Sequence, residues 1–362
     1  METLHTAIIS VPTSLPDSLR TEWEDLWRNS PSANMFNSPG WFAAASRAFT
    51  YEDKIVILIR ESFNNNLVAV VPLVKTRIYG LSVFALPGSE FVDRFSFLAD
   101  LTIVAVAREI VKALSEIGTV YITGLTGEDV RLISEKNKHI WFFAIDKNPY
   151  LNFERGKDIN LPSSEKSKSM QRAKRSFGQI GFSLVKKNHK EALYTAFKID
   201  QQSSKNEKGK GIFWRDDAKQ FFIALAEENP DCLFVELLSF AEKPVSYSIG
   251  FVNRGIYACS QKAHLSEYGH YRPGGLAFLK FLEMIAFEEP REVDFGKGYD
   301  QFKMDFTKTF RLLYGLVVSK SHTKRLFFLI AHKTREKIYQ IFNHSQLYKF
   351  YKNLKKKQLQ KS

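Results

Sequence analysis

The stretch Tyr271-Arg272-Pro273-Gly274-Gly275-Leu276 is followed at once by an apolar, helix-periodic run over residues 277–286, and together they predict the start of a helix. Proline is pre-set for the first helical position, and two adjacent glycines let another molecule approach the backbone closely. The first amides of a helix have no partner inside it, and the helix dipole adds partial positive charge there. We therefore expect a site for an anion such as a diphosphate, with a plain turn that begins a helix as an equal alternative.

The sequence on both sides of this stretch is β-rich. Residues 255–262 precede it and residues 292–298 follow the helix, so the order is strand, glycine-lined helix start, helix, strand. This order is typical of a place that holds a phosphorylated cofactor.

Bulk composition predicts a globular protein of two domains. The chain has 362 residues, of which 44% are hydrophobic and 25% charged, with 31 Phe for the cores. The start has no signal-peptide pattern, and no apolar run approaches the ~20 residues of a membrane span, so we expect a cytoplasmic protein. Cys232 and Cys259 suit a reducing compartment and have no metal-ligand spacing; buried thiols are favoured over a catalytic one.

Positive charge is concentrated at the C-terminal end. Residues 321–362 hold eleven Lys or Arg against one acid, Glu336, while the whole chain carries +13. The apolar positions of this tail recur at helical spacing, which predicts basic amphipathic helices. They could lie on an anionic membrane, peripherally at its inner face, or pack on the protein, and packing is the favoured interpretation.

The order of predicted elements occurs twice. The hairpin at 54–60 and 67–73 corresponds to one at 232–238 and 245–251, and a helix and a short strand follow in both halves. We interpret this as a duplication, favoured over chance. The expected domains are residues 1–151, a basic linker or helix at 152–179, a second domain at 180–320 and the tail at 321–362. The first half has Leu98-Ala99-Asp100-Leu101 in place of the glycines, so only the second half is expected to bind an anionic cofactor.

These motifs resemble those of a known family. The element order resembles the GNAT acetyltransferase fold, and the motifs Tyr271–Leu276, Asp294–Gly298 and Tyr299–Lys303 resemble the FemAB-like, CelD-like acetyltransferase group. Phe36–Phe42 is similar to a Ser-Pro-x-Trp motif near the start of the same proteins. The resemblance covers residues 5–320 and implies an α/β (α+β) fold of two tandem GNAT-like domains, with mixed, mostly antiparallel sheets flanked by helices.

The resemblance further implies acetyl-CoA or another acyl-CoA as co-substrate, with no metal. The splayed edge of the strand at 255–262 would bind the pantetheine amides and the helix start would bind the diphosphate. The cofactor-binding residues expected on this basis are Ser260, Gln261, Arg272, Gly274, Gly275 and Leu276. Two positions depart from the family pattern: Phe302 stands where a Tyr is usual, and Glu267 where an Asp is frequent. Substrate contacts of the loop at 265–271 therefore stay open.

Acyl transfer to an amine or hydroxyl needs proximity, an oxyanion donor and a proton acceptor, but no covalent enzyme intermediate. Asp294 is a candidate base, with satisfaction of the following glycine turn as an equal alternative. His264 could accept a proton near neutral pH, although a surface histidine is the more frequent situation. Tyr299 could donate to the leaving thiolate or simply stack. These three are the predicted catalytic residues.

Three residues are predicted to contact the acceptor. Lys303 could neutralise a phosphate or sugar carboxylate, or be an ordinary surface lysine; Glu267 lies in the loop before the helix start, and Trp41 belongs to the Ser-Pro-x-Trp motif. The basic run at 166–187 could grip a nucleotide-linked or phospholipid-linked acceptor, while a solvated helix face is slightly favoured.

The predicted function is an N- or O-acyltransferase that moves an acetyl or other short acyl group from acyl-CoA to a cell-envelope or polysaccharide precursor. The acceptor would be a small molecule or a lipid- or nucleotide-linked sugar. One alternative is a FemAB-type ligase of peptidoglycan-like synthesis that uses aminoacyl-tRNA. The other is a non-catalytic relative that binds a membrane or partner. Acyl length, N- versus O-acylation and oligomeric state have no signature in the sequence.

Overall fold

The computed structural model describes residues 3–134, 139–153 and 167–342, with side chains up to residue 334 of the last helix. The chain divides into two compact units. The first comprises the residues up to Pro149 together with Gly296–Thr334, and the second is built on Tyr150–Phe295.

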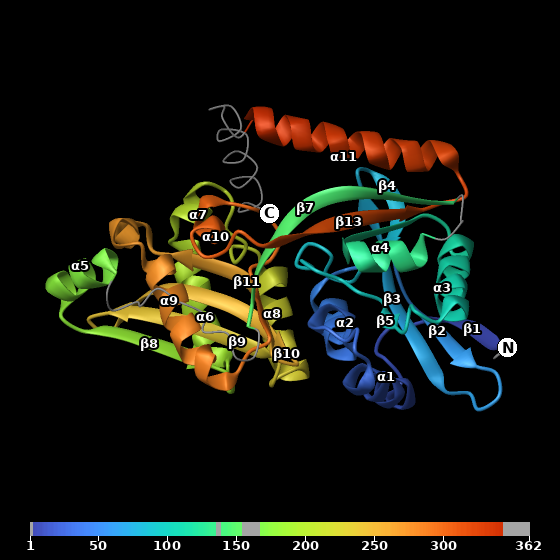
Figure 1. The fold of residues 1–362 in the computed structure, drawn as a ribbon, viewed down its shortest axis with the longest axis horizontal. Helices are drawn as coiled ribbons and strands as arrows, with labels where there is room; N and C mark the ends of the chain where they lie inside the picture. The colour runs from blue at the N-terminus through green and yellow to red at the C-terminus, as the bar shows by residue number, and fades with distance from the viewer. Residues whose placement is uncertain (1–2, 135–138, 154–166, 343–362) are drawn as a thin grey trace. The chain divides into compact units, whose positions relative to one another are not determined.

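The first unit is a mixed sheet with helices on it (Figure 1). Its strands follow the order β1-β2-β3-β4-β6-β13-β7, and the neighbours from β1 to β4 are antiparallel while β4 and β6 are parallel. Its elements are β1 (Leu4–Ser10), α1 (Asp17–Asn29), α2 (Pro39–Ala48), β2 (Asp53–Glu61), β3 (Leu67–Ile78), β4 (Leu81–Ala85), β5 (Leu98–Ala99), α3 (Val104–Glu116), β6 (Val120–Thr126), α4 (Gly127–Ile133), β7 (Ile140–Asn152), α10 (Gln301–Met304), β13 (Phe310–Val318) and α11 (His322–Phe342).

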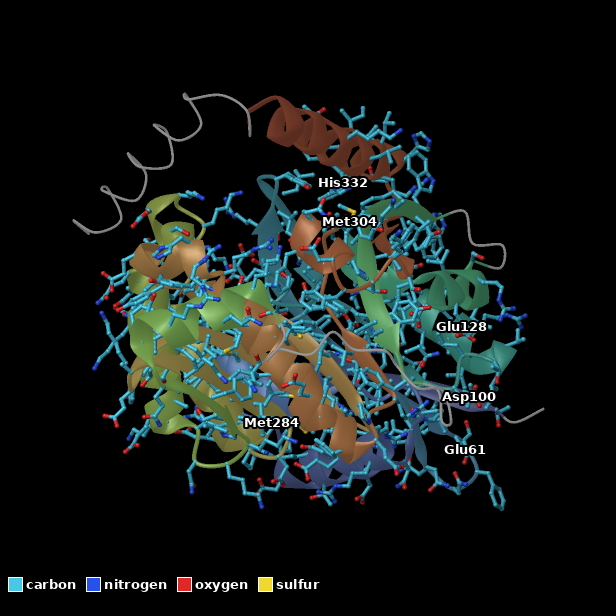
Figure 2. The ribbon with its side chains drawn as sticks, turned by 60° about the vertical axis from the view of Figure 1, so that its left-hand side comes forward. Glu61, Asp100, Glu128, Met284, Met304 and His332 are labelled. Atoms are coloured by element: carbon cyan, nitrogen blue, oxygen red, sulfur yellow. The ribbon has the colours of Figure 1, made fainter. Side chains whose placement is uncertain are left out.

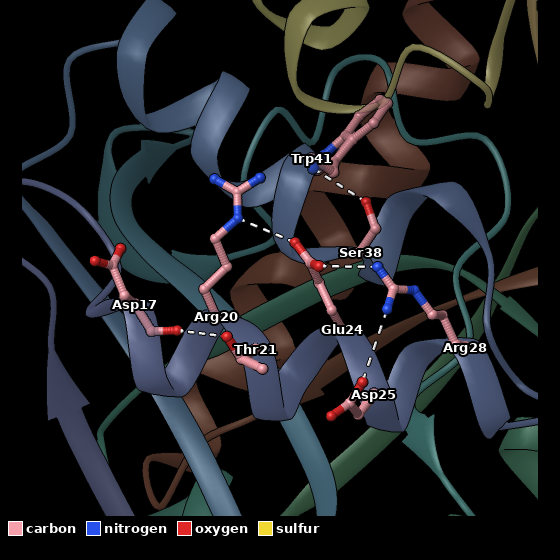
Figure 3. A network of polar contacts seen from close by, with 8 residues as sticks. All are labelled: Asp17, Arg20, Thr21, Glu24, Asp25, Arg28, Ser38 and Trp41. Carbon is pink, nitrogen blue, oxygen red and sulfur yellow. Dashed lines mark hydrogen bonds and ion pairs between the residues drawn. The ribbon is translucent and has the colours of Figure 1, made fainter.

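Helices α1 and α2 pack on each other through buried aromatic rings. Trp23 and Phe42 are almost fully buried and pack with their ring centroids 5.8 Å apart. Ser38 is the N-cap of α2, because its Oγ accepts a hydrogen bond from the amide of Trp41 at 3.0 Å (Figure 3). The opposite face of α1 carries surface ion pairs that join Glu24 to Arg20 and Arg28.

The second unit has a sheet in the order β8-β9-β10-β11-β12, and residues 150–152 of β7 pair with β12. Helix α9 covers one face and α6 and α8 cover the other (Figure 1). Phe281 of α9 packs on Phe234, whereas Phe222 of α8 stacks on Phe251. The elements are α5 (Lys168–Phe177), β8 (Ile180–Val185), α6 (Lys190–Gln201), α7 (Ser204–Glu207), α8 (Asp216–Glu228), β9 (Leu233–Phe240), β10 (Lys243–Asn253), β11 (Ile256–His264), the 3₁₀ turn η2 (Ser266–Tyr271), α9 (Pro273–Ile285), η3 (Ala286–Glu288) and β12 (Glu292–Asp294).

The two units repeat one order of elements, as the sequence predicts. In each, a strand, helices and three antiparallel strands are followed by a helix and a strand that pairs in parallel with the third strand of the meander. The predicted α/β fold with tandem units is therefore confirmed.

The expected domain boundary is wrong at the C-terminal side. Residues 296–320 were assigned to the second domain, but β13 hydrogen-bonds between β6 and β7 and belongs to the first unit. Within the predicted basic linker or helix at 152–179, residues 154–166 lie outside the described residues, and Lys168–Phe177 forms α5.

Helix α11 packs on the first unit through part of its surface. Phe328 is fully buried against Tyr79 and Tyr121, with ring centroids 6.1 and 5.3 Å away. The favoured packing interpretation therefore holds for this face of the helix, while residues 343–362 lie outside the described residues. Among the helices that the structure describes, none is both long and apolar enough to cross a membrane.

Candidate functional site

The third strand of the second unit has a half-open edge. β11 pairs in parallel with β12 only at Ile256, Tyr257 and Ala258. The rest of the strand, Cys259–His264, pairs with β10 but meets no strand on its other side in the described part of the chain. A strand edge without a neighbour presents backbone N–H and C=O groups to an incoming chain. The edge is open because β12 ends at Asp294, and it can hold an extended amide-bearing ligand.

A β-bulge interrupts the pairing of this strand with β10. Ile249 lies opposite Gln261 and Gly250 lies opposite Cys259, so Ser260 is left without a partner across the ladder. Its Oγ is buried and makes no hydrogen bond with the described residues. The Gln261 side chain is engaged, because its Oε1 accepts a hydrogen bond from Lys205 Nζ at 3.2 Å. The side chain of Gln261 therefore keeps only its amide N–H groups for a cofactor.

Helix α9 begins at the predicted position, and its first turn is open. Arg272 is left-handed, with φ 55° and ψ 50°, and no side chain caps the helix. The amides of Gly275 and Leu276 both donate to the Arg272 carbonyl, at 3.0 and 3.2 Å. The amide of Gly274 has no acceptor among the described residues. A Cβ atom at Gly274 or Gly275 would meet nothing within 4 Å, so packing does not demand these glycines.

Leu276 does not fit its predicted role. Its side chain is 1% exposed and lies in the core, and its amide is already bonded to the Arg272 carbonyl. The amide of Gly275 is bonded to the same carbonyl, so the amide that this helix start leaves for an anion is that of Gly274.

A basic helix borders the turn that leads into α9. Arg172 of α5 donates from Nη1 to the His270 carbonyl at 3.2 Å, and Ser176 shares a hydrogen bond with Tyr271. The sequence of α5, Lys168–Phe177, contains four Lys or Arg residues and no acid. This arrangement places positive charge beside the start of α9 and adds to its attraction for an anion.

Two of the predicted proton acceptors bracket the open edge. Asp294 forms the last pair with β11, opposite Ala258, and is 2% exposed. His264 ends the strand, and its imidazole makes no hydrogen bond with the described residues. Burial, and then the positive charge of Lys208, lower the pKa of His264 below its usual value. Its ring is therefore neutral at pH 7 and able to accept a proton.

Sequence reasoning missed Glu236 of β9. It is fully buried, and no hydrogen bond reaches either carboxylate oxygen within the described residues. Cross-strand register places it beside Ser248 and, one strand further, Lys262. Burial raises the pKa of Glu236 to about 8, although the charge of Lys262 and the nearby Ser248 hydroxyl oppose this shift. A single acid inside the apolar strand Leu-Phe-Val-Glu-Leu-Leu was the available signal.

Lys303 is not a substrate-binding residue. It is 6% exposed, and its Nζ donates to the carbonyls of Gly296, Lys297 and Gly298 at 3.0, 2.7 and 3.1 Å. All three ammonium protons are used, so none is left for a phosphate or carboxylate. The lysine instead fixes the glycine turn that follows Asp294, in which Gly296 and Gly298 have positive φ.

Trp41 is also a core residue rather than a substrate contact. It is fully buried and its indole N–H donates to the Pro87 carbonyl at 2.8 Å, so packing accounts for the Ser-Pro-x-Trp motif. Glu267 is exposed in an ion pair with Lys243, whose hydrogen bond lowers the pKa of the carboxyl. Tyr299 belongs to the first unit, where its ring packs against Phe310. Roles of Glu267 and Tyr299 in the reaction stay predictions.

Among its described residues, the first unit has no comparable open edge, because β4 ends at Ala85, directly after its one pair with β6. There β4 pairs with β6 only between Phe84 and Val120, and the chain then returns so that Phe95 pairs with Leu125 of β6. Phe95 is fully buried, and its amide donates to the Gly124 carbonyl. A Cβ at Gly124 would lie 2.9 Å from the Asp93 carbonyl oxygen, which shows how closely this segment packs. The open edge of β11 is therefore the candidate site.

Comparison with known proteins agrees with the fold. Residues 164–304 match the family of acetyltransferase (GNAT) domains, and this range contains the open edge of β11 and the start of α9. No protein in the curated set matches the sequence. Within the part of the chain that the structure describes, no cluster of His, Cys, Asp or Glu could hold a metal ion.

Solved structures resemble nearly the whole chain. The structure of FemX superposes with a TM-score of 0.60 at 9% identity, covering 90% of this chain and 99% of that one. The structure of L-PGS from Bacillus licheniformis gives 0.54 at 12% identity, covering 89% and 98%. The C-terminal domain of a putative lysylphosphatidylglycerol synthetase from Agrobacterium fabrum gives 0.52 at 9% identity, covering 86% and 94%. At these identities the likeness concerns the fold.

Proposed function

We propose that the protein is an acyltransferase that takes an acetyl or other short acyl group from acyl-CoA. Two observations together carry this proposal. β12 ends at Asp294, opposite Ala258, so β11 runs on without that neighbour, and the turn η2 then leads from the end of β11 to an open, glycine-lined helix start. The strand edge offers backbone groups to the pantetheine amides. The helix start offers the Gly274 amide and the helix dipole to the diphosphate.

The chemistry assigned to the chain's own residues is positioning and proton removal. An acceptor amine or hydroxyl attacks the thioester carbonyl, the C–S bond breaks, and the thiolate leaves with the coenzyme. His264 or Asp294 accepts the proton of the acceptor, since each lies at one end of the open edge. Backbone N–H groups at the Ser260 bulge are the candidate donors to the oxyanion.

The proposed acceptor is a small molecule or a lipid- or nucleotide-linked sugar that serves as a precursor of the cell envelope or of a polysaccharide. It follows from the resemblance of the motifs to FemAB-like and CelD-like proteins. An acyl transfer to nitrogen and one to oxygen would both use the same proton acceptors.

A second candidate is aminoacyl transfer from tRNA, and two observations favour it. The whole-chain fold is like that of FemX, and α5 places basic side chains beside the helix start, where they could contact phosphates of a larger ligand. The narrow glycine-lined start of α9 favours the compact diphosphate of coenzyme A.

Calorimetry of the full-length protein separates the two candidates. We expect heat with CoA and acetyl-CoA and a raised melting temperature at saturating coenzyme, because a ligand that binds only the folded state stabilises it. Arg172→Gln should weaken CoA binding about three- to tenfold and reduce its salt dependence, since it removes one charge near the site. Lys219→Gln on α8 is the matched control, which should leave CoA binding unchanged.

Binding of charged tRNA without any heat from CoA would instead establish the second candidate. Once CoA binding is established, labelled acetyl-CoA incubated with nucleotide sugars and lipid precursors tests the acceptor. If the coenzyme binds but none of these compounds is labelled, the acceptor class is wrong and the donor assignment stands.

A further inference from the structure

Helix α11 has two different faces. Its inner face packs on the first unit through Phe328 and the 6% exposed Arg325. His332 lies on the same inner face, with its ring 4.8 Å from that of Phe143 (Figure 2). Its outer face presents Leu326, Phe327 and Ile330, which are 40%, 40% and 55% exposed.

These three side chains form one apolar stripe. Residues three and four apart lie next to each other on a helix, so Ile330 adjoins both Leu326 and Phe327. Large apolar side chains that stay exposed as a group mark a surface that binds something, whereas isolated ones need no explanation.

The charge around the stripe is positive. Lys320, Lys324 and Lys333 are exposed, and no acid occurs between residues 320 and 334. The sequence that follows α11, residues 343–362, adds six lysines and no acid. The apolar stripe therefore lies among exposed lysines, and the sequence that follows the helix is strongly basic.

We infer that the outer face of α11 is a docking surface for an anionic lipid bilayer. Leu326, Phe327 and Ile330 enter the boundary between headgroups and acyl chains, and the lysines contact the anionic headgroups. A second copy of the chain is a poor occupant because it would bring two positive surfaces together. An anionic bilayer satisfies both the apolar stripe and its charge.

Co-sedimentation of the full-length protein with lipid vesicles tests this inference. We expect binding to vesicles of equal parts phosphatidylcholine and phosphatidylglycerol that is at least about tenfold tighter than to phosphatidylcholine alone, and weaker at high salt. The triple variant L326Q/F327Q/I330Q should lose at least about tenfold in binding without a change of net charge. The variant K355Q/K356Q/K357Q should lose at least about tenfold through its charge alone.

The matched control is F63Q/I103Q/V104Q, which removes three exposed apolar side chains of the first unit away from α11. It should bind anionic vesicles like the unchanged protein. Equal binding by the α11 triple variant and this control would overturn the inference, as would absence of binding to anionic vesicles. If light scattering instead shows a dimer that only the α11 variant dissociates, while vesicles are not bound, the face is an interface between copies and the inference is wrong.

Discussion

Replacing Gly275 by alanine should stabilise the protein and weaken coenzyme binding at the same time. Gly275 has no positive φ, and an added Cβ would meet no atom within 4 Å, so the fold accepts the methyl group. Removing a glycine from a helix contributes up to about 1 kcal/mol, or roughly 2–4 °C in melting temperature for a unit of this size.

The same methyl group takes up space that we assign to the diphosphate. The methyl group would hold the diphosphate away from the neighbouring Gly274 amide. A hydrogen bond to a charged group contributes about 1.5–3 kcal/mol, so its loss should raise the Kd for CoA about 10- to 100-fold. Calorimetric titration with CoA and a melting curve of the same sample measure both effects.

A control substitution separates helix stability from ligand contact. Met284→Ala changes a 42% exposed residue near the other end of α9, and it should leave the Kd for CoA unchanged. If Gly275→Ala melts higher but binds CoA with the unchanged Kd, the first turn of α9 does not hold the diphosphate and our assignment of the donor site fails.

Three further predictions concern buried and titrating groups. The pKa of Glu236 is about 8 in the folded protein against 4.5 as the ordinary value, so the free energy of unfolding should fall by roughly 4–5 kcal/mol as the pH rises from 4.5 to 8. Urea unfolding at pH 5 and pH 9 should show this fall in the free energy of unfolding for the unchanged protein but not for Glu236→Gln. An equal fall in both proteins would contradict the prediction. Lys303→Met removes three hydrogen bonds and should lower the free energy of unfolding by about 3 kcal/mol, with the KM for the acceptor unchanged; a raised KM for the acceptor at unchanged stability would restore a substrate role. Lys208→Gln should raise the pKa of His264 and move the low-pH limb of the activity profile to higher pH, whereas an unmoved limb would exclude His264 as the base.

Much of the fold could be predicted because its signals are local. The first hairpin is predicted at 54–60 and 67–73 and occurs at Asp53–Glu61 and Leu67–Ile78, since runs of β-branched residues define its strands. The start of α9 was found from proline and glycine, whose backbone preferences are independent of distant contacts. The open strand edge beside it was implied by family resemblance.

The errors concern contacts between residues far apart in the sequence. β13 pairs with β6 and β7 across more than 150 residues, and nothing in its local pattern names its neighbours. The predicted substrate-binding roles of Lys303 and Trp41 are wrong because both side chains are buried and donate to backbone carbonyls. The sequence alone does not show these hydrogen-bond partners. Glu236 was overlooked for the same reason, since the burial that gives it an unusual pKa is a tertiary property.

The contrast between the two units explains why one fold would carry a single donor site. In both, the third strand of the meander loses its parallel neighbour after one or a few pairs. In the first unit the chain fills the edge of β6 with the Phe95 segment, which buries apolar surface and satisfies the Gly124 carbonyl. In the second unit no strand takes that place among the described residues, and glycines keep the adjacent helix start open. Of the two strands, only β11 runs on beyond its parallel pairs with backbone groups left for a ligand, because β4 ends at Ala85, directly after its one pair with β6.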